Sequence, residues 1–284
     1  FDDTQDRISA GTVGLWAFGP GEKHFDDLAV SDLNGAHYLL AESFEVHAAD
    51  ADPVGWRQTS ARVQHDLAAN LFQTNLVSQQ RFFGTNSTVD HIHAHYYPTD
   101  QAVNVQTWVS YEYSGCMKMS DEEGGIGVTF FSQFPNRAAY YALRRRADDD
   151  AAFQLVGYPN TNEAGGSKLS SLTKDGEVKP APNRWYRFRI AVTHVPDYRA
   201  SEQSTPKPTT FIKAKVWPDG QPEPLDYQYE ALDDVNPLTA GTVGMWTAGD
   251  GAKYFDDLKV VSVAVAPDGQ PAPLLTENFE QYAE

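Results

Sequence analysis

The chain of 284 residues contains a single cysteine, Cys116. One cysteine cannot form a disulfide within the chain, so the fold must be stable without a covalent cross-link. Free cysteines are among the most buried residue types, and we therefore expect Cys116 to be a buried, unreactive thiol.

Long apolar segments are also missing. No apolar run approaches the ~20 residues that a membrane-spanning helix needs, so we expect no membrane insertion. A secretory signal is absent as well. Because the chain begins with Phe1 rather than Met, we interpret it as a mature or excised piece of a longer protein.

Basic residues are scarce relative to acidic ones, at 22 against 39, which gives a formal net charge of −17. Such a surface repels nucleic acid and anionic lipid, so we expect neither as a partner. It attracts divalent cations. The hydrophobic fraction of 41% is ordinary, so the acidity does not indicate disorder.

The most informative feature that is present is an internal repeat. Two motifs near the start of the chain, Ala-Gly-Thr-Val-Gly-Leu-Trp and Phe-Asp-Asp-Leu, recur near its end, both at an offset of 230 residues. A third motif, Leu-Leu-Ala-Glu-Ser-Phe-Glu, recurs in similar form at an offset of 235. The paired segments are 10–16 with 240–246, 25–28 with 255–258, and 39–45 with 274–280.

The period of the repeat corresponds to about one domain. We therefore interpret residues 1–34 as the closing strands of a preceding repeat and residues 35–263 as one complete repeat. Residues 264–284 are then a linker, rich in Pro and Gly, and the opening strand of a following repeat.

Strand signals fill the complete repeat. Apolar and polar residues alternate over 103–113, 185–192 and 211–217, as they do in half-buried strands. No segment keeps a helical period over three turns. Many strands without helices predict a β-sandwich or a β-barrel.

These segments resemble a known family. The residues 185–189, 212–217 and 241–244, followed by Phe-Asp-Asp-Leu at 255–258, are similar to the second half of laminin G-like, concanavalin A-like modules. The resemblance implies an all-β, two-sheet antiparallel concanavalin A-like jelly-roll sandwich in an extracellular or cell-surface protein. This fold carries lectins, glycan-binding modules, glycosidases, lyases and structural domains, so it implies no single function.

The same resemblance implies a structural calcium ion between the first and last strands. The matching carboxylates are Glu45 with Asp256 or Asp257. Neighbouring residues of a regular strand point to opposite faces, so we expect only one of the two aspartates to bind the ion directly. The alternative is that these carboxylates are solvated surface groups.

Three histidines, His91, His93 and His95, are spaced by two residues. On a strand they line one face, while Ile92 and Ala94 face the core. A row of imidazoles is suited to contact a glycan or to bind a transition metal. The alternative is a polar outer strand without a ligand.

Further candidates for glycan contact are Tyr97 and Arg144. Tyr97 belongs to a set of aromatic residues that we expect to be exposed, with Tyr96, Trp108 and Tyr140. Arg144 opens a run of three arginines in an acidic chain, which suits an acidic sugar or a neighbouring repeat. The alternative for this run is a solvated strand end.

A catalytic motif is not recognisable. Retaining glycosidases need two closely spaced carboxylates, and the Glu-x-Asp-x-x-Glu strand of glycosidases with this fold does not occur. The segments 91–93 and 211–215 are only loosely similar to the catalytic strands of alginate lyases. We therefore expect no enzymatic activity, with a polysaccharide lyase as the alternative.

The sequence thus predicts a structural or adhesive tandem-repeat unit of a large extracellular surface or filament protein, stabilised by calcium. Its expected partners are further copies of the same repeat, arranged head to tail, and possible glycan ligands define the alternative of a lectin-like module. The apolar residues expected in the assembly strands are Val13, Leu15, Trp16, Phe25 and Phe279.

Overall fold

The structure is a computed structural model, and it forms two compact units. The smaller unit comprises residues 1–32 and 273–284, and the larger comprises residues 33–272. The structure describes residues 28–30, 38–45, 47–48, 53, 55–60, 63–66, 73–77, 80–88, 92–97, 107–147, 152–158, 167–169, 178–199, 205–263 and 275–277.

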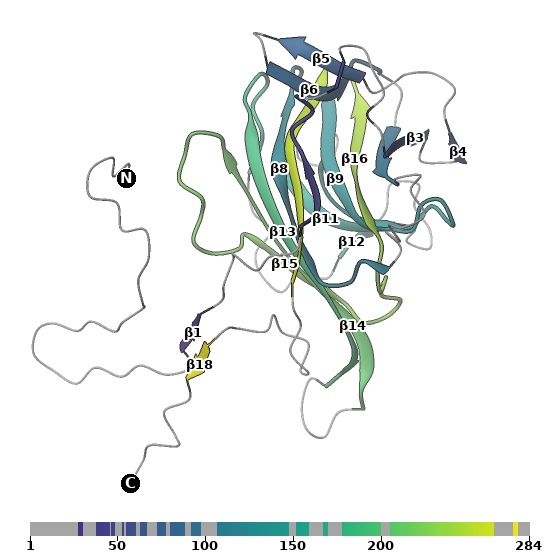
Figure 1. Cartoon of the computed structure of the whole chain (residues 1–284), viewed down its shortest axis with the longest axis vertical. Coiled ribbons are helices and arrows are strands. Elements are labelled where there is room, and N and C mark those ends of the chain that lie inside the picture. The colour runs from purple at the N-terminus through teal and green to yellow at the C-terminus, as the bar shows by residue number, and fades with distance from the viewer. Residues whose placement is uncertain are drawn as a thin grey trace, which may run out of the picture. The chain divides into compact units, whose positions relative to one another are not determined.

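The described residues of the larger unit form two eight-stranded antiparallel sheets (Figure 1). Sheet I has the strand order β12-β11-β10-β9-β16-β7-β3-β4. Its strands are β12 (Ser167–Lys168), β11 (Phe153–Tyr158), β10 (Tyr140–Arg145), β9 (Gly124–Ser132), β16 (Thr242–Gly249), β7 (Ile92–Tyr96), β3 (Trp56–Ser60) and β4 (Val63–Asp66).

Sheet II has the order β15-β14-β13-β8-β17-β6-β5, and β2 pairs with β17 beside β6. Its strands are β15 (Tyr229–Asp233), β14 (Lys207–Pro218), β13 (Tyr186–Tyr198), β8 (Tyr111–Met119), β17 (Lys253–Ser262), β6 (Gln80–Thr85), β5 (Gln73–Val77) and β2 (Tyr38–Glu42).

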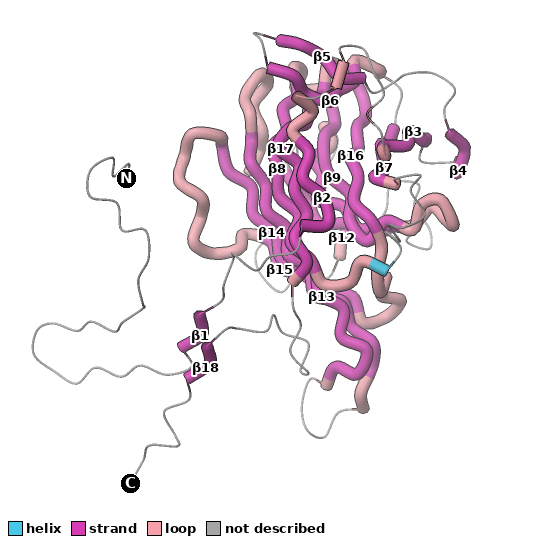
Figure 2. Tube along the Cα trace, viewed as in Figure 1, coloured by secondary structure: helices cyan, strands magenta, loops and turns pink. Residues whose placement is uncertain are grey.

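Strands that are distant in sequence lie side by side in both sheets. β16 lies between β9 and β7, and β17 lies between β8 and the pair β6 and β2. Strands and loops make up nearly all of the described chain (Figure 2). The predicted fold class, an all-β two-sheet antiparallel concanavalin A-like jelly-roll sandwich, is therefore confirmed.

The core lies between the two sheets and follows from the period-two alternation. On β8 and β13 every second side chain faces inward, including Tyr113, Phe188 and Ile190, which are 0–1% exposed. The strands predicted over 185–192 and 211–217 are thus confirmed as parts of β13 and β14. Cys116 is buried, as predicted.

The strand predicted over 103–113 is wrong in its middle part. Among the described residues of this segment, the strand begins only at Tyr111. Ser110 has a φ of 49°, a left-handed conformation that interrupts a strand, and Trp108 is 6% exposed and packs in the core. The expected exposure of Trp108 is therefore also wrong.

The smaller unit contains one described strand pair, β1 (Leu28–Val30) with β18 (Leu275–Glu277). Its register corresponds, motif for motif, to the register of β17 with β2. The equivalent pairs are Leu28↔Glu277 and Leu258↔Glu42, Ala29↔Thr276 and Lys259↔Ala41, and Val30↔Leu275 and Val260↔Leu40.

The predicted division of the chain into repeat pieces stays a prediction. The residues expected in the assembly strands, Val13, Leu15, Trp16, Phe25 and Phe279, lie outside the described residues. In the part of the chain that the structure covers, no helix has the length and apolar character needed to span a membrane.

Candidate functional site

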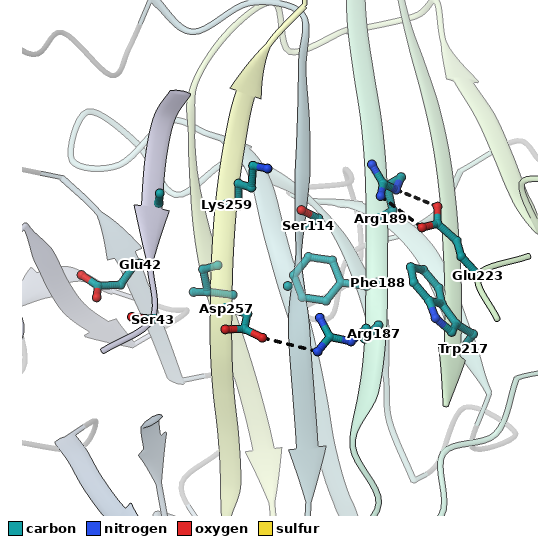
Figure 3. Close-up of a pocket in the computed structure, with 13 residues that line it drawn as sticks. Glu42, Ser43, Ser114, Arg187, Phe188, Arg189, Trp217, Glu223, Asp257 and Lys259 are labelled. Atoms are coloured by element: carbon teal, nitrogen blue, oxygen red, sulfur yellow. Dashed lines mark hydrogen bonds and ion pairs between the residues drawn. The ribbon is translucent and has the colours of Figure 1, made fainter. Parts of the chain in front are cut away.

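A groove of about 480 Å³ lies on the outer face of sheet II (Figure 3). The strands β2, β17, β8, β13 and β14 all contribute to it. The groove follows from the alternation on these strands: the inward-facing residues build the core, and the residues between them build an outer surface of charged and small side chains.

The floor of the groove is the short side chain of Ser114 on β8. Its register partners are Arg189 on β13 and Lys259 on β17, and Lys259 in turn pairs with Ala41 on β2. Two small residues therefore alternate with two long cationic ones along one row across the sheet. The hollow exists because Ser114 and Ala41 do not fill the space that their neighbours enclose.

One wall of the groove is a network of ion pairs around Arg189. The guanidinium donates to Glu112 and to Glu223, whose Oε1 lies 2.7 Å from Nε of Arg189. Nζ of Lys215 lies 2.8 Å from the same Glu223 oxygen. Although burial opposes it, hydrogen bonds from Lys215 and Arg189 lower the pKa of Glu223, so this carboxylate is held in its charged form.

A second cation, Arg187, lies one row further along β13. Its Nε donates to Asp219 at 2.6 Å, and its Nη2 lies 3.4 Å from Oδ2 of Asp257. Trp217 is the register partner of Arg187 on β14 and closes this end of the groove. Figure 3 shows Arg187 and Asp257 facing each other across β8.

The position of Asp257 departs from the regular strand alternation that we assumed for Asp256 and Asp257. The register of β17 with β8 shifts between Asp256 and Lys259, and Asp257 has a φ of 53°. Strict alternation therefore fails at this bulge. The bulge leaves the side chain of Asp257 50% exposed and within reach of Arg187.

Asp256, beside the groove, has a carboxyl group whose pKa is strongly raised. Burial, with smaller contributions from the charges of Asp257 and Glu45, raises the pKa of the Asp256 carboxyl to about 7, although a hydrogen bond from the Asp257 backbone N–H and the charge of Arg187 act in the opposite direction. Glu45 lies in the exposed turn after β2. The structure thus brings two of the predicted calcium residues, Glu45 and Asp256, into electrostatic contact and directs Asp257 toward Arg187.

Whether a cation occupies this place stays a prediction. Repulsion between neighbouring carboxylates fits a cation-binding role. In the described part of the chain, however, no three His, Cys, Asp or Glu side chains form a group suited to hold a metal ion. Calcium at Asp256 and Glu45 would therefore have to take further oxygen ligands from backbone or water.

The edge of the groove contains Glu42, a residue that the sequence did not single out as a candidate. Its Oε1 accepts a hydrogen bond from the backbone N–H of Phe44 at 2.7 Å, and its Oε2 lies 3.0 Å from Nε2 of His47. The sequence could have indicated Glu42 through the internal repeat, because both copies of the third motif have a glutamate at this position, Glu42 in the first and Glu277 in the second.

The predicted histidine row lies on the other sheet. Ile92 and Ala94 face the core, as predicted, and His93 and His95 point to the outer face of sheet I. The two imidazoles stack with ring centres 5.3 Å apart, and both are buried, at 1% and 4% exposure. Burial lowers the pKa of His95 to about 3, so this ring is neutral at ordinary pH.

His91 lies outside the described residues, and glycan contact by the histidines stays a prediction. Tyr97 is partly buried and packs edge-on against Phe134. Tyr140, which we expected to be exposed, is 6% exposed and lies 4.9 Å from His93.

Arg144 also differs from expectation. Its guanidinium lies 5.1 Å from the ring centre of Trp246, and the residue is 5% exposed. Arg145 is buried as well and donates to the carbonyl of Gly124. The alternative of a solvated strand end is therefore wrong for these two arginines, whose strand, β10, is buried along its whole length.

Comparisons with known proteins give low similarity. No family model matches the chain, and no curated protein matches it. Solved structures do match. An alginate lyase, Aly36B, solved as a mutant with alginate tetrasaccharide, is 10% identical with a TM-score of 0.43, over 80% of this chain and 98% of the lyase.

Two further structures have similar values. The β-glucanase of Bacillus licheniformis is 12% identical with a TM-score of 0.42, over 82% of this chain and 100% of the glucanase. A protein of unknown function with a galectin-like fold from Bacillus subtilis is 12% identical with a TM-score of 0.43, over 78% of this chain and 98% of that protein. Similarities at this level do not distinguish a binding protein from an enzyme.

Proposed function

We propose that the sandwich is a carbohydrate-binding module whose ligand lies in the groove over Ser114. The observation that supports this proposal is that positively and negatively charged side chains line the groove in equal numbers. Three cationic side chains line the groove, and so do three carboxylates: Arg187, Arg189, Lys259, Glu42, Glu223 and Asp257.

A lining with equal numbers of donors and acceptors suits a ligand that carries many hydroxyl groups. Each hydroxyl both donates and accepts, so it can bind between a guanidinium and a carboxylate. Arg187 and Arg189 are already held in place by their ion pairs, which reduces the entropy lost on binding. Trp217 adds an aromatic surface at one end.

We further propose that the module does not cleave its ligand. Glu223 is kept ionised by Lys215 and Arg189, so it is unsuited to donate a proton as a general acid. Incubation with uronate polymers tests this proposal against a lyase. Ultraviolet absorbance from unsaturated sugar ends would contradict it.

Filling the groove tests the binding proposal. Ser114→Tyr places a large side chain on the floor, and Tyr is well accepted in strands. Thr193→Tyr on β13 is the matched control, because it makes a similar change on the same strand set away from the groove lining. A glycan array identifies ligands, and calorimetry then measures their affinity for each variant.

The expected result is loss of binding in Ser114→Tyr and retained binding in Thr193→Tyr, with unchanged circular dichroism in both. Equal affinity of both variants and the original chain would refute the groove as the binding site. An array without any bound glycan would refute carbohydrate binding itself.

A second function is favoured by a different observation. We propose that the chain is also a unit of a laminin G-like tandem array in an extracellular protein, assembled head to tail. The observation is the shared register: β1 with β18 repeats, motif for motif, the pairing of β17 with β2. Because equivalent motifs pair in the same register in two places, the closing strand of one copy could pair in the same way with the opening strand of the next copy.

A cysteine pair tests this assembly. Ala29→Cys with Thr276→Cys places two thiols at register partners of β1 and β18. The equivalent pair Ala41→Cys with Lys259→Cys, in β2 and β17, is the control. Assembly predicts a ladder of disulfide-linked oligomers for the first pair and monomers for the control. Monomers for both pairs would contradict assembly between chains.

Calcium belongs to the same proposal as a stabilising ion. Asp256 and Glu45 would hold it near the junction of β17 with β2, where a hard cation would relieve the repulsion between their carboxylates.

A further inference from the structure

Lys118 on β8 lies in an aromatic cluster on the outer face of sheet II. Its Nζ is 4.8 Å from the ring centre of Trp185, 5.1 Å from that of Tyr254 and 6.0 Å from that of Phe82. An ammonium group over ring faces at distances up to about 6 Å is held by cation–π attraction. The cluster is thus a positioned cation with an aromatic surround.

The rings are themselves fixed. Phe82 packs edge-on against Tyr254 at 4.6 Å and against Trp185 at 6.2 Å. Tyr254 lies directly against Gly84 on β6, where an added Cβ would approach its ring carbon to 2.7 Å. The missing side chain at Gly84 therefore lets the ring of Tyr254 lie close to the sheet, and the cluster is rigid.

Lys118 has no anionic partner in the described structure. Its contacts there are the three rings, whereas Arg187, Arg189 and Lys215 on the same face all form ion pairs with carboxylates. The side chain is partly buried rather than extended into water. Partial burial without a counter-ion is unfavourable for an ammonium group, so an anion brought by a ligand would find it incompletely solvated.

The cluster lies on the same strand face as the groove. Lys118 and Ser114 are four residues apart on β8, which corresponds to roughly 13 Å at the usual rise per residue. Cys116 lies between them and points to the same face. A ligand that follows β8 can therefore reach both places if it is an oligosaccharide, whereas a single sugar cannot.

We propose that Lys118, Trp185 and Tyr254 form an acidic-sugar subsite, which binds the carboxylate of a uronic acid residue at Lys118 and one face of its ring on the aromatic cluster. This inference rests on the proposed carbohydrate binding and extends it, because it names the class of sugar at one end of the ligand. Trp185 and Tyr254 are both partly exposed, so their rings are accessible to a ligand.

The test uses two probes, a galacturonic acid hexamer and its fully methyl-esterified form, in which each charged carboxylate is replaced by a neutral methyl ester. Calorimetry measures both against the original chain, Lys118→Met, Trp185→Ala and Lys213→Met. Met keeps the apolar length of the lysine and its packing on the rings. Lys213 is the matched control, because it is a lysine on the same face with one tyrosine contact.

We expect the original chain and Lys213→Met to prefer the acid by about tenfold, in line with one charge-assisted hydrogen bond. Lys118→Met should bind acid and ester equally, and Trp185→Ala should weaken binding of both. The preference should also decrease with added salt.

The outcomes separate the two proposals. Equal binding of acid and ester by the original chain, or equal loss in Lys118→Met and Lys213→Met, would overturn the subsite and leave the groove untouched. Binding of neither probe, while other glycans bind in the groove, would also overturn the subsite alone. A preference for the acid that persists in Ser114→Tyr, at the affinity of the original chain, would support the subsite and refute the groove.

Discussion

Tyr111 connects the two sheets through a hydrogen bond that ordinary core packing does not supply. β9 carries one extra residue opposite β16, because Thr242 pairs with Ser132 but Gly244 pairs with Thr129. Phe131 sits in this bulge with a φ of 47°, and its backbone N–H donates to the hydroxyl of Tyr111 at 2.8 Å. Tyr111→Phe removes the acceptor and leaves a buried N–H without a partner.

The expected loss of stability follows from this orphaned donor. A buried group left unsatisfied costs about 1–3 kcal/mol, and about 2 kcal/mol lowers Tm by roughly 4–8 °C in a domain of this size. Tyr113→Phe is the matched control, because the Tyr113 hydroxyl only donates to the carbonyl of Gly244 at 3.5 Å. Its removal leaves no donor unpaired, and we expect it to cost under about 1 kcal/mol.

Equilibrium unfolding in urea measures both variants. The midpoint should fall more for Tyr111→Phe than for Tyr113→Phe, at an unchanged slope with denaturant. Equal losses would show that the bulge does not depend on the tyrosine hydroxyl. A changed slope would mean that the variant alters the folded or unfolded state as a whole, and the comparison would then not support the argument.

Three further predictions concern Asp256 and the packing of sheet I. Burial raises the pKa of Asp256 to about 7, so without calcium the contribution of this carboxyl to stability is full below about pH 4 and is lost as the pH rises to about 7. The shift corresponds to about 4 kcal/mol, but for a half-exposed group we expect a loss of about 1–2 kcal/mol. Urea midpoints compared across pH measure this loss, which should be absent in Asp256→Asn. Calcium at a hundredfold excess over Kd should add about 2.7 kcal/mol, and an unchanged Tm after chelation, with no metal found by elemental analysis, would refute this. Gly127→Ala should cost about 1–3 kcal/mol in urea unfolding, because the added Cβ would lie 2.6 Å from Cα of Arg144, and a neutral result would show that β9 and β10 can separate.

Local alternation was enough to predict most of the sandwich strands but not their ends. β13 and β14 follow the predicted pattern because each buries one face against the opposite sheet. The segment that ends at Tyr113 has the same alternation, yet Ser110 adopts a left-handed conformation and the strand starts after it. Alternation indicates which side chains are buried, not which residues form a strand. Trp108 lies in a loop but is buried, so the alternating pattern extends beyond the start of the strand.

The buried polar residues of sheet I show a second limit. An outer strand with alternating histidines predicts a solvated face, but His93, His95 and Arg144 are almost fully buried. Sheet I is covered on both faces at its centre, since β9 and β10 are buried at every position. A sequence pattern gives the side of the strand on which a residue lies, and the packing of other segments decides whether that side meets water.

The groove could not be predicted because its residues become neighbours only through register. Ser114, Arg189 and Lys259 come from three strands that are far apart in the sequence. The wall formed by β2 and β17 carries motifs that recur within the chain, with Glu42 repeated as Glu277 and Asp257 as Asp27. The wall formed by β8 and β13 has no such counterpart in this chain, because the repeated segments include only the strands at the start and end of the sandwich. The repeated motifs therefore contribute residues to one wall of the groove, while the residues that would decide what binds there lie on the wall that no repeat marks.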